Sequence, residues 1–289
     1  MYWIVTDSTT DLPLTYINAQ ENFKVVSLSY TMDGQSHIPD GTVENSRAIY
    51  ADLRAGKVIT TAQINVEEWK EQISDLLIKG QDVLVIAFSS GLSGTYAAGV
   101  QAVKELKEQY PDRKLAIVDS LSASMGEGLL VHYALQKRQE GLTLEENAKW
   151  VEENRLNIVH WFTVDDLMFL KRGGRVSATS AYLGSIIKIK PILNVDEAGH
   201  LIPRDKVQGR KRSIRALFER TEANAVDIAD QTVFISHGDC EEEAQSLADM
   251  LREKLDVKNI LMGYIGPIIG SHSGPGTIAV FFVGNGRKV

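Results

Sequence analysis

The sequence contains a single cysteine, Cys240, among its 289 residues. One cysteine excludes an internal disulfide bond and any zinc site built from several cysteines. No apolar run approaches the roughly 20 residues that a membrane-spanning helix needs, and the first seven residues lack the basic segment of a signal peptide. We therefore expect a cytoplasmic protein with no transmembrane segment and no metal site.

Sequence motifs for nucleotide binding are also missing. The chain has neither the G-x-x-x-x-G-K-[ST] pattern of a P-loop nor a complete G-x-G-x-x-G pattern. Its 31 Lys and Arg residues are outnumbered by 38 Asp and Glu residues, which gives a formal net charge of −7. Because an acidic chain without a long basic tract binds nucleic acid poorly, we expect no nucleic-acid partner and no cofactor.

Strand-like and helix-like segments alternate through the first half of the chain. The runs at 83–88 and 114–118 are mostly apolar, as in strands buried on both faces, and residues 23–30 alternate like a half-buried strand. Asn65 can cap a helix, and Thr143 with a glutamate three residues later has the spacing of a capping box. This rhythm predicts a mostly parallel sheet with helices on both faces.

The second half of the chain has a different pattern. Strand signals near 158–164 and 277–283 flank a hairpin signal at 191–202, which indicates mixed strand directions. We predict an α/β fold with two domains, a parallel-sheet N-terminal domain at 1–155 and a mixed-sheet α/β C-terminal domain at 156–289.

Three expected strands of the first half end in turns rich in hydroxyl groups. These turns lie at 6–10, 89–95 and 119–124. If the strands are parallel, all three turns meet at the carboxyl edge of the sheet, where open α/β sheets bind their ligands. One such turn is ordinary loop composition, but three at one edge predict a polar pocket.

The middle turn, Ser-Ser-Gly-Leu-Ser-Gly-Thr, has the layout of an anion site between a strand and a helix. Gly94 allows close approach of the backbone, and Ser93 and Thr95 supply hydroxyls beside the free N–H groups of the first helical turn. Two other interpretations stay open. Ser93 or Thr95 can simply cap the helix, and Ser93 can be a nucleophile, although the G-x-S-x-G pattern is incomplete and five histidines are candidate partners.

Two further polar stretches are candidates for anion recognition. His272 precedes a rigid Gly-Pro-Gly turn and can hydrogen-bond an anionic ligand. Arg172 and Arg175 flank paired glycines and suit a phosphate group or an acidic surface. The simpler alternative for each stretch is a solvated loop.

Together these motifs resemble the DegV family of bacterial fatty-acid-binding proteins. The resemblance covers nearly the whole chain and rests on residues 5–9, 89–96, 118–120, 170–177 and 272–276 in that order. The runs S-S-x-L-S-G-T-Y, L-K-x-G-G-R and H-[ST]-G-P-G are the specific part. The chain departs from the family at 61–64, where it has T-A-Q-I in place of the usual T-S-Q-P.

The resemblance implies a lipid carrier rather than an enzyme. One long-chain fatty acid would be buried, with its carboxylate held by the hydroxyls of Thr61 and Ser93 and with His272 nearby. A separate ATP-binding fatty acid kinase subunit would phosphorylate the bound carboxylate to an acyl-phosphate for phospholipid synthesis. Arg172 and Arg175 would dock that partner. The alternatives are a serine-dependent acyl hydrolase and a binding module for another small anionic metabolite.

Overall fold

The computed structural model describes residues 1–176 and 189–287, so Ser177, the last residue of the Gly- and Arg-rich stretch, lies outside the described residues. A four-stranded sheet forms the first half, in the order β2-β1-β6-β7 with all neighbours parallel. Its strands are β1 (Trp3–Asp7), β2 (Phe23–Val26), β6 (Val83–Ala87) and β7 (Leu115–Asp119). The predicted parallel sheet is confirmed, and we call it the parallel sheet.

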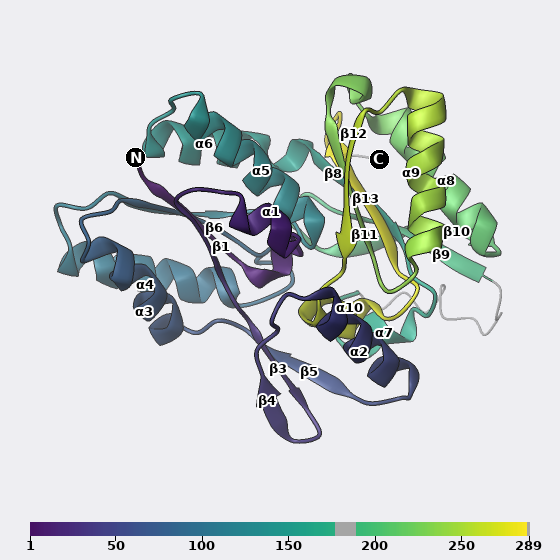
Figure 1. The fold of residues 1–289 in the computed structure, drawn as a ribbon, viewed down its shortest axis with the longest axis horizontal. Helices are drawn as coiled ribbons and strands as arrows, with labels where there is room; N and C mark the ends of the chain where they lie inside the picture. Colours follow the sequence, from purple (N-terminus) through teal and green to yellow (C-terminus); the bar gives the residue numbers. More distant parts are fainter. Residues whose placement is uncertain (177–188, 288–289) are drawn as a thin grey trace.

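Helices cover both faces of the parallel sheet (Figure 1). All five residues of β6 are buried. Val83 and Val85 belong to the core shared with α3 and α4, whereas Leu84 and Ile86 belong to the core shared with α5. Successive side chains of β6 point to opposite faces of the sheet, and each face is covered by an apolar layer. The strand is therefore apolar at every position. The helices are α3 (Val66–Leu77), α4 (Thr95–Gln109), α5 (Met125–Gln139) and α6 (Leu144–Asn154).

Capping boxes begin two of these helices. The side chain of Asn65 accepts a hydrogen bond from the backbone of Glu68, whose carboxylate accepts one from the backbone of Asn65. Thr143 and Glu146 make the same reciprocal pair at the start of α6. Each pair satisfies two N–H groups that would otherwise lack an intrahelical partner, so both predicted helix starts are confirmed.

The single strand predicted at 23–30 is wrong. The chain leaves the parallel sheet after Val26, and the Leu28 N–H donates instead to Ser8 Oγ at 3.0 Å. A new strand then begins in a small antiparallel sheet of order β4-β3-β5, which extends away from the body of the protein (Figure 1). Its strands are β3 (Ser29–Met32), β4 (Gln35–His37) and β5 (Ile59–Ala62), and α2 (Val43–Arg54) lies between β4 and β5.

A six-stranded mixed sheet forms the second half, in the order β10-β9-β8-β13-β11-β12. Only β11 and β12 pair in parallel, and the other neighbours are antiparallel, as the sequence predicted. Helices α8 and α9 cover its outer face (Figure 1). The elements are β8 (Ile158–Thr163), β9 (Ile189–Val195), β10 (Leu201–Gln208), α8 (Arg210–Asn224), β11 (Thr232–His237), α9 (Glu241–Leu255), β12 (Asn259–Tyr264) and β13 (Ile278–Val283).

Short helices complete the fold around the junction of the two sheets. Helices α7 and α10 lie beside α2, below the mixed sheet in the view of Figure 1. The short α-helices are α1 (Leu14–Asn18), α7 (Met168–Arg172) and α10 (Pro267–Ser273), and the 3₁₀ turns are Ser8–Thr10, Arg155–Asn157 and Ile228–Asp230. No helix in the described part of the chain combines the length and apolar character needed to cross a bilayer.

One hydrophobic core joins the two halves. It contains Leu84 of the parallel sheet, Leu129 of α5 and Phe281 of the mixed sheet, all nearly inaccessible to solvent. Near the C-terminus, the buried Arg287 donates to Ile158 O at 2.9 Å and to Ser122 Oγ at 2.8 Å. These bonds tie the turn after β7 to β8, so the halves are packed closely. The division between residues 155 and 156 stays a prediction.

Candidate functional site

A cavity of about 400 Å³ lies between the carboxyl edge of the parallel sheet and the inner face of the mixed sheet. Such a volume is in the range of small-molecule sites. Most of its wall is apolar and comes from the turns after β6 and β7, from strands β8 to β10 and β13, and from α10. The apolar lining residues are Leu28, Ala62, Phe88, Leu92, Ala123, Phe162, Leu170, Val195, Leu201, Ile265, Ile268, Ile269, Ala279 and Phe281.

The cavity is elongated along strand β13. Thr277, Ala279 and Phe281 all line it, because alternate residues of a strand point to the same face. Thr277 and Phe281 are separated by four residues of extended chain, or roughly 14 Å, so the cavity wall runs along the strand over about that length. An apolar space of this shape suits a linear hydrocarbon.

A hydrogen bond between Thr61 and His272 marks the polar end of the cavity. Thr61 Oγ1, near the end of β5, lies 2.8 Å from Nε2 of His272 in α10, and both residues line the cavity. Burial, with a further contribution from the charge of Arg175, lowers the pKa of His272 to about 4. The imidazole is therefore neutral at pH 7 and can donate a hydrogen bond to a carboxylate only in the matching tautomer.

The loop after α7 packs directly on the His272 ring. A Cβ on Gly173 would lie 2.3 Å from His272 Nδ1, so only glycine leaves room for the ring there. Arg175 lines the cavity and donates to the Gly173 carbonyl. Arg172 is exposed instead, with its guanidinium 4.6 Å from the ring centre of Phe169. The two arginines thus have different positions: Arg175 faces the cavity and Arg172 faces outward.

Ser93 and Gly94 line the same cavity at the start of α4. Gly94 is the N-cap and provides no side-chain cap. Ser93 Oγ accepts a hydrogen bond from Thr95 N at 3.2 Å and lies 2.9 Å from Thr95 Oγ1. A Cβ on Gly94 would lie only 2.0 Å from Oε1 of Gln63, so the glycine lets the end of β5 approach α4.

The hydrogen bonds of Ser93 differ from those of a catalytic triad. In the described part of the chain, its hydroxyl is bonded to Thr95, and Nε2 of His272 is bonded to Thr61. A triad requires a hydrogen bond between the serine hydroxyl and a histidine nitrogen. The geometry therefore favours binding over nucleophilic attack.

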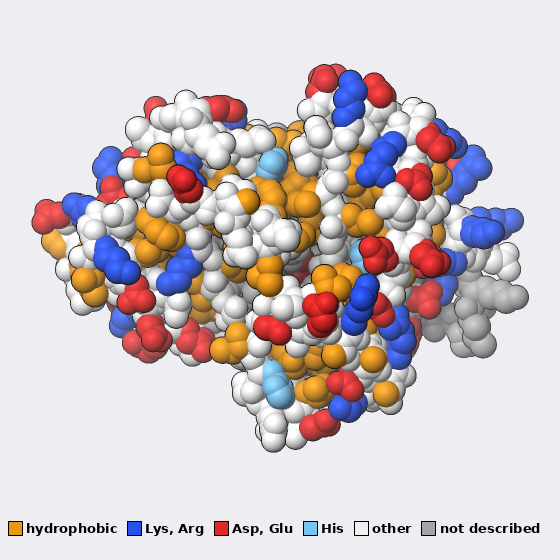
Figure 2. All heavy atoms as spheres, viewed as in Figure 1, with side chains coloured by type: hydrophobic (Ala, Val, Ile, Leu, Met, Phe, Trp, Pro, Cys, Tyr) orange, Lys and Arg blue, Asp and Glu red, His pale blue; other side chains and the backbone are white. Residues whose placement is uncertain are grey.

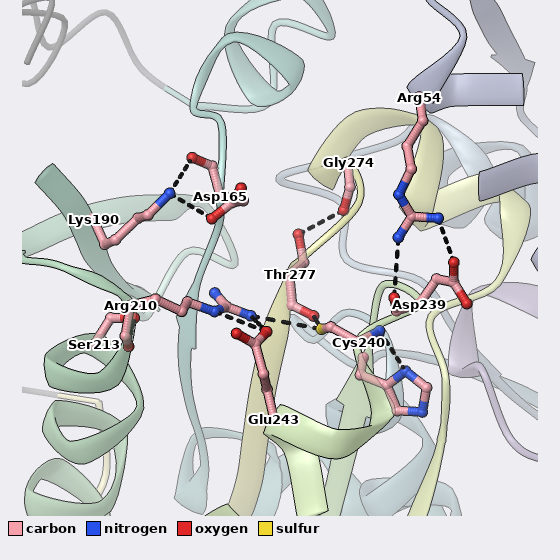
Figure 3. A network of polar contacts seen from close by, with 11 residues as sticks. Arg54, Asp165, Lys190, Arg210, Ser213, Asp239, Cys240, Glu243, Gly274 and Thr277 are labelled. Carbon is pink, nitrogen blue, oxygen red and sulfur yellow. Dashed lines mark hydrogen bonds and ion pairs between the residues drawn. The ribbon is translucent and has the colours of Figure 1, made fainter. Parts of the chain in front are cut away.

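The turn that follows His272 is fixed from behind by strand β13 and helix α9 (Figure 3). Thr277 Oγ1 lies 2.9 Å from the carbonyl oxygens of both Ser273 and Gly274. Cys240, the N-cap of α9, places its Sγ 3.4 Å from the Thr277 carbonyl oxygen. Figure 3 also shows Arg54 of α2 reaching Asp239, a contact that joins α2 to the turn after β11.

The three hydroxyl-rich turns do meet at one sheet edge, but they do not all face the cavity. Asp7 Oδ2, from the first turn, accepts a hydrogen bond from Phe88 N at 2.9 Å, and Asp119, from the third, accepts one from Ser90 N at 3.2 Å. Ser93 and Ser124 line the cavity, whereas residues 6–10 are absent from its lining. The first turn builds framework beside this cavity, and its Ser8 and Thr10 line a separate hollow.

Four carboxyl groups are buried in this framework, those of Asp7, Asp11, Asp119 and Glu127. Burial raises the pKa of Asp11 to about 7. Burial, with repulsion from Asp7, raises the pKa of Glu127 well above its ordinary value. None of the four lines the cavity. Among the described residues, no group of His, Cys, Asp and Glu side chains has an arrangement suited to a metal ion.

Two other hollows adjoin the cavity. One of about 650 Å³ shares Ile268 with it and has several charged residues on its wall, including Arg47 and Glu241. Figure 2 shows hydrophobic side chains gathered on the surface between the two sheet-bearing halves and charged ones mostly on the outer helices. A smaller hollow of about 210 Å³ includes Thr61 and His272 together with Lys57, Arg172 and Arg175.

The sequence did not assign His160 or Ser273, which are polar residues of the cavity wall, to the binding site. Both side chains are buried, and His160 Nε2 and Ser273 Oγ have no hydrogen-bond partner. Ser273 lies inside a motif already selected for its histidine. His160 was one of the five histidines considered as partners of Ser93, and its position in an otherwise apolar strand was the available signal that it is buried.

Comparison with known families matches residues 2–285 to the family described as "Uncharacterised protein, DegV family". The chain belongs to the DegV family. It is 44% identical to a DegV domain-containing protein of Clostridium perfringens over 286 residues, which cover 99% of this chain and 98% of that protein.

Solved DegV structures share the fold. A DegV lipid-binding protein of Thermotoga maritima is 30% identical, with a TM-score of 0.86 and full coverage of both chains. A second Thermotoga maritima protein, TM841, described as revealing fatty acid binding function, is also 30% identical, with a TM-score of 0.85 over 98% of this chain and 99% of that one. The predicted family and fold class are therefore confirmed.

Proposed function

We propose that this protein binds one long-chain fatty acid, with the hydrocarbon in the 400 Å³ cavity and the carboxylate at its polar end. The observation that carries this proposal is the elongated apolar cavity with the Thr61–His272 hydrogen bond at one end. Thr61, Ser93, Gly94 and His272 are the proposed carboxylate-binding residues. The DegV proteins described as binding lipids and fatty acids support the same ligand class.

The hydrocarbon supplies most of the binding free energy in this proposal. Each buried methylene contributes about 0.8 kcal/mol, so a chain of about 14 methylenes gains roughly 11 kcal/mol, part of which is offset by the roughly 4–15 kcal/mol lost on association. Each hydrogen bond to the carboxylate adds roughly 1.5–3 kcal/mol if it replaces water well. The polar end therefore sets the orientation of the ligand, and the apolar wall sets its affinity.

The cation that lines the cavity also fits this ligand. Arg175 borders both the cavity and the smaller hollow outside the Thr61–His272 pair. Its charge attracts a carboxylate without requiring a protonated His272. We therefore assign Arg175 to the ligand as well as to the originally predicted docking surface.

In the same proposal, a separate ATP-binding kinase subunit phosphorylates the presented carboxylate to an acyl-phosphate for phospholipid synthesis, and this chain acts as a non-enzymatic carrier. The sequence has no nucleotide motif, so ATP must be bound by a partner. Arg172 is exposed and lines the smaller hollow of about 210 Å³, which Thr61 and His272 also line. An exposed guanidinium there suits docking of an acidic partner surface.

The first test is to identify the bound ligand by mass spectrometry after organic extraction of the purified protein. We expect a fatty acid at about one molecule per chain. Ile269→Asp, which introduces a charge into the cavity wall, should weaken fatty acid binding by at least about 100-fold. Ile78→Asp is the matched control, because Ile78 is 70% exposed. Empty extracts, with thermal stabilisation by small polar anions but not by fatty acids, would contradict the proposal.

The kinase step has its own test. Acyl-phosphate formation should require ATP, a bacterial fatty acid kinase subunit and this protein loaded with fatty acid. Arg172→Ala should slow the reaction while leaving fatty acid affinity unchanged. Arg215→Ala is the control, because that arginine lies on the outer helix α8 with its side chain 73% exposed. Equal rates for the two variants would argue against docking through Arg172.

A further inference from the structure

Strand β12 is one of the two edge strands of the mixed sheet, and β10 is the other (Figure 1). Among the described strands, β12 pairs only with β11. The six residues of β12 are Asn-Ile-Leu-Met-Gly-Tyr, and none of them is buried, charged or a proline. The free side of this strand is therefore an accessible edge without charge.

The backbone of β12 directs a row of hydrogen-bonding groups away from the sheet. Ile265 N, directly after the strand, donates to His237 O at 2.8 Å, so every second residue counted back from Ile265 points its backbone groups at β11. Ile260, Met262 and Tyr264 therefore direct both their N–H and their C=O groups outward. Within the described residues, these groups have no hydrogen-bond partner in the protein. Such a row is a template for a further strand.

The opposite edge of the same sheet is protected against such pairing. Strand β10 contains Pro203, which has no N–H group, and its register shifts between Pro203 and Asp205. Arg204, Asp205 and Lys206 place three ionisable side chains in succession there. A proline, a bulge and charged side chains are the usual features that stop an edge strand from pairing with another chain. The sheet thus blocks one edge and leaves the other open, which indicates that β12 receives a partner.

The free edge of β12 borders the hollow of about 650 Å³. Met262, Gly263 and Tyr264 line this hollow together with Leu14 and Ile17 of α1. An added strand gains affinity from its backbone hydrogen bonds and specificity from pockets that accept its alternate side chains. An extended segment paired with β12 can therefore place apolar side chains in the hollow.

The charges around the hollow favour a basic segment. Asp40, Glu44 and Glu241 line the hollow and are exposed, and among the described residues Arg47 is the one Lys or Arg in its lining. Arg47 is already engaged, because its Nε donates to the hydroxyl of Tyr264 at 3.0 Å. A second copy of this chain would bring the same carboxylates, and a net charge of −7, against their equals. Lysine or arginine side chains complement this wall instead.

We propose that the free edge of β12 is a docking site for an extended segment of a partner protein, and that this segment carries lysine or arginine together with apolar side chains. The segment adds to the mixed sheet as a further strand, and its backbone bonds to the outward groups of Ile260, Met262 and Tyr264. The docking site is independent of fatty acid binding, because none of these three residues lines the fatty-acid cavity.

The test uses a short, end-blocked peptide of alternating valine and lysine as the probe for the full-length protein. Hydrogen exchange followed by NMR should show that saturating peptide slows exchange of the amides of Ile260, Met262 and Tyr264 by at least about tenfold. Replacement of the lysines by glutamate should weaken peptide binding by at least about tenfold at low salt. Unchanged exchange of these amides, or equal binding of the two peptides, would overturn the proposal.

Two substitutions of one residue separate the backbone edge from the side chain. Met262→Pro removes an outward N–H without removing a hydrogen bond of the free protein, and it should weaken peptide binding by at least about tenfold. Met262→Val is the matched control, because it keeps the N–H, and it should change binding by less than about twofold. Equal binding by the two variants would overturn pairing through β12. Slow amide exchange without peptide, with sedimentation as a dimer that Met262→Pro dissociates, would assign the edge to a second copy and overturn the partner segment.

Discussion

Two groups of polar side chains occupy the region around the carboxyl edge of the parallel sheet, and they differ in what they face. Thr61, Ser93 and His272 line the cavity and are only partly buried. Asp7 and Glu127 are completely buried and bond to the protein itself. The first group borders the open space of the cavity, whereas the second joins the turns together. Polar composition at a sheet edge therefore indicates a site only where the polar atoms border an open space.

The comparison predicts that changes in the two groups have separable effects. Substitutions in the buried framework should lower the free energy of unfolding and leave the affinity of the folded protein nearly unchanged. Substitutions on the cavity wall should do the reverse. A variant of either group that altered both quantities equally would remove the distinction.

The largest effect is expected for Asp7→Ala. Asp7 accepts hydrogen bonds from Phe88 N at 2.9 Å and Thr9 N at 3.0 Å, and removal of its carboxyl leaves both buried donors without a partner. The free energy of unfolding should fall by roughly 2–4 kcal/mol. Denaturant titration measures the loss, with the exposed Asp112→Ala as the control. A loss below about 0.5 kcal/mol would show that Asp7 is not part of the framework.

The next effect is expected for Thr61→Val, which keeps the shape of the side chain but removes the hydroxyl. Fatty acid affinity should fall about tenfold, because a hydrogen bond to a carboxylate is lost and His272 loses its partner. Unfolding should change little. Thr60→Val is the control, because Thr60 is an exposed neighbour in the same strand. Equal affinities of the two variants would place the carboxylate elsewhere.

The predictions from sequence succeeded where a single local pattern determines structure. The apolar run at β6 and the capping residues Asn65 and Thr143 each correspond to an element that the structure contains. The predictions failed where a contact with a residue distant in the sequence determines the local structure. The break after Val26 depends on Ser8, which takes the Leu28 N–H, and no spacing within 23–30 reveals that.

The candidate site shows the same limit. The motif residues Thr61, Ser93 and His272 come together on one cavity, although 211 positions separate Thr61 from His272. The sequence alone did not distinguish Arg172 from Arg175, because their directions depend on how the loop packs against His272. His160 was one of five histidines that the sequence offered as partners of Ser93, and only the folded structure separates it from the others, because it places His160 on the cavity wall.

A smaller effect, on the pH dependence of stability, is expected for Glu127→Gln. Thr9 Oγ1 lies 2.8 Å from Glu127 and also bonds to Asp7, and a hydroxyl has one hydrogen for two carboxyl groups. This geometry agrees with the raised pKa of Glu127, which keeps its proton in the folded protein. Above pH about 4 the unfolded chain loses that proton first, so stability falls as pH rises toward the folded-state pKa.

Asp11, with a folded-state pKa of about 7, contributes the same trend between pH about 4 and 7. Glu127→Gln removes one of these contributions, so its stability curve should decline less steeply with pH than that of the wild type. Denaturant titrations from pH 5 to pH 8 measure the slope, with the exposed Glu222→Gln as the control. A slope as steep as that of the control would show that Glu127 is ionised in the folded protein.

The smallest effect is expected for the pH dependence of fatty acid affinity between pH 6 and pH 8. Burial and Arg175 keep the pKa of His272 at about 4, so the imidazole stays neutral throughout this range and its contribution to binding is constant. The positive charge at this end of the cavity comes from Arg175, which lines it. The affinity should therefore vary by less than about twofold in calorimetric titrations, and His272→Gln should give an equally flat profile at lower affinity. The contradicting result is a wild-type affinity that decreases tenfold as the pH rises through 6.5, with a flat profile for the variant. This result would show that a protonated His272 holds the carboxylate. The cavity wall would then contain a titrating group like those of the buried framework.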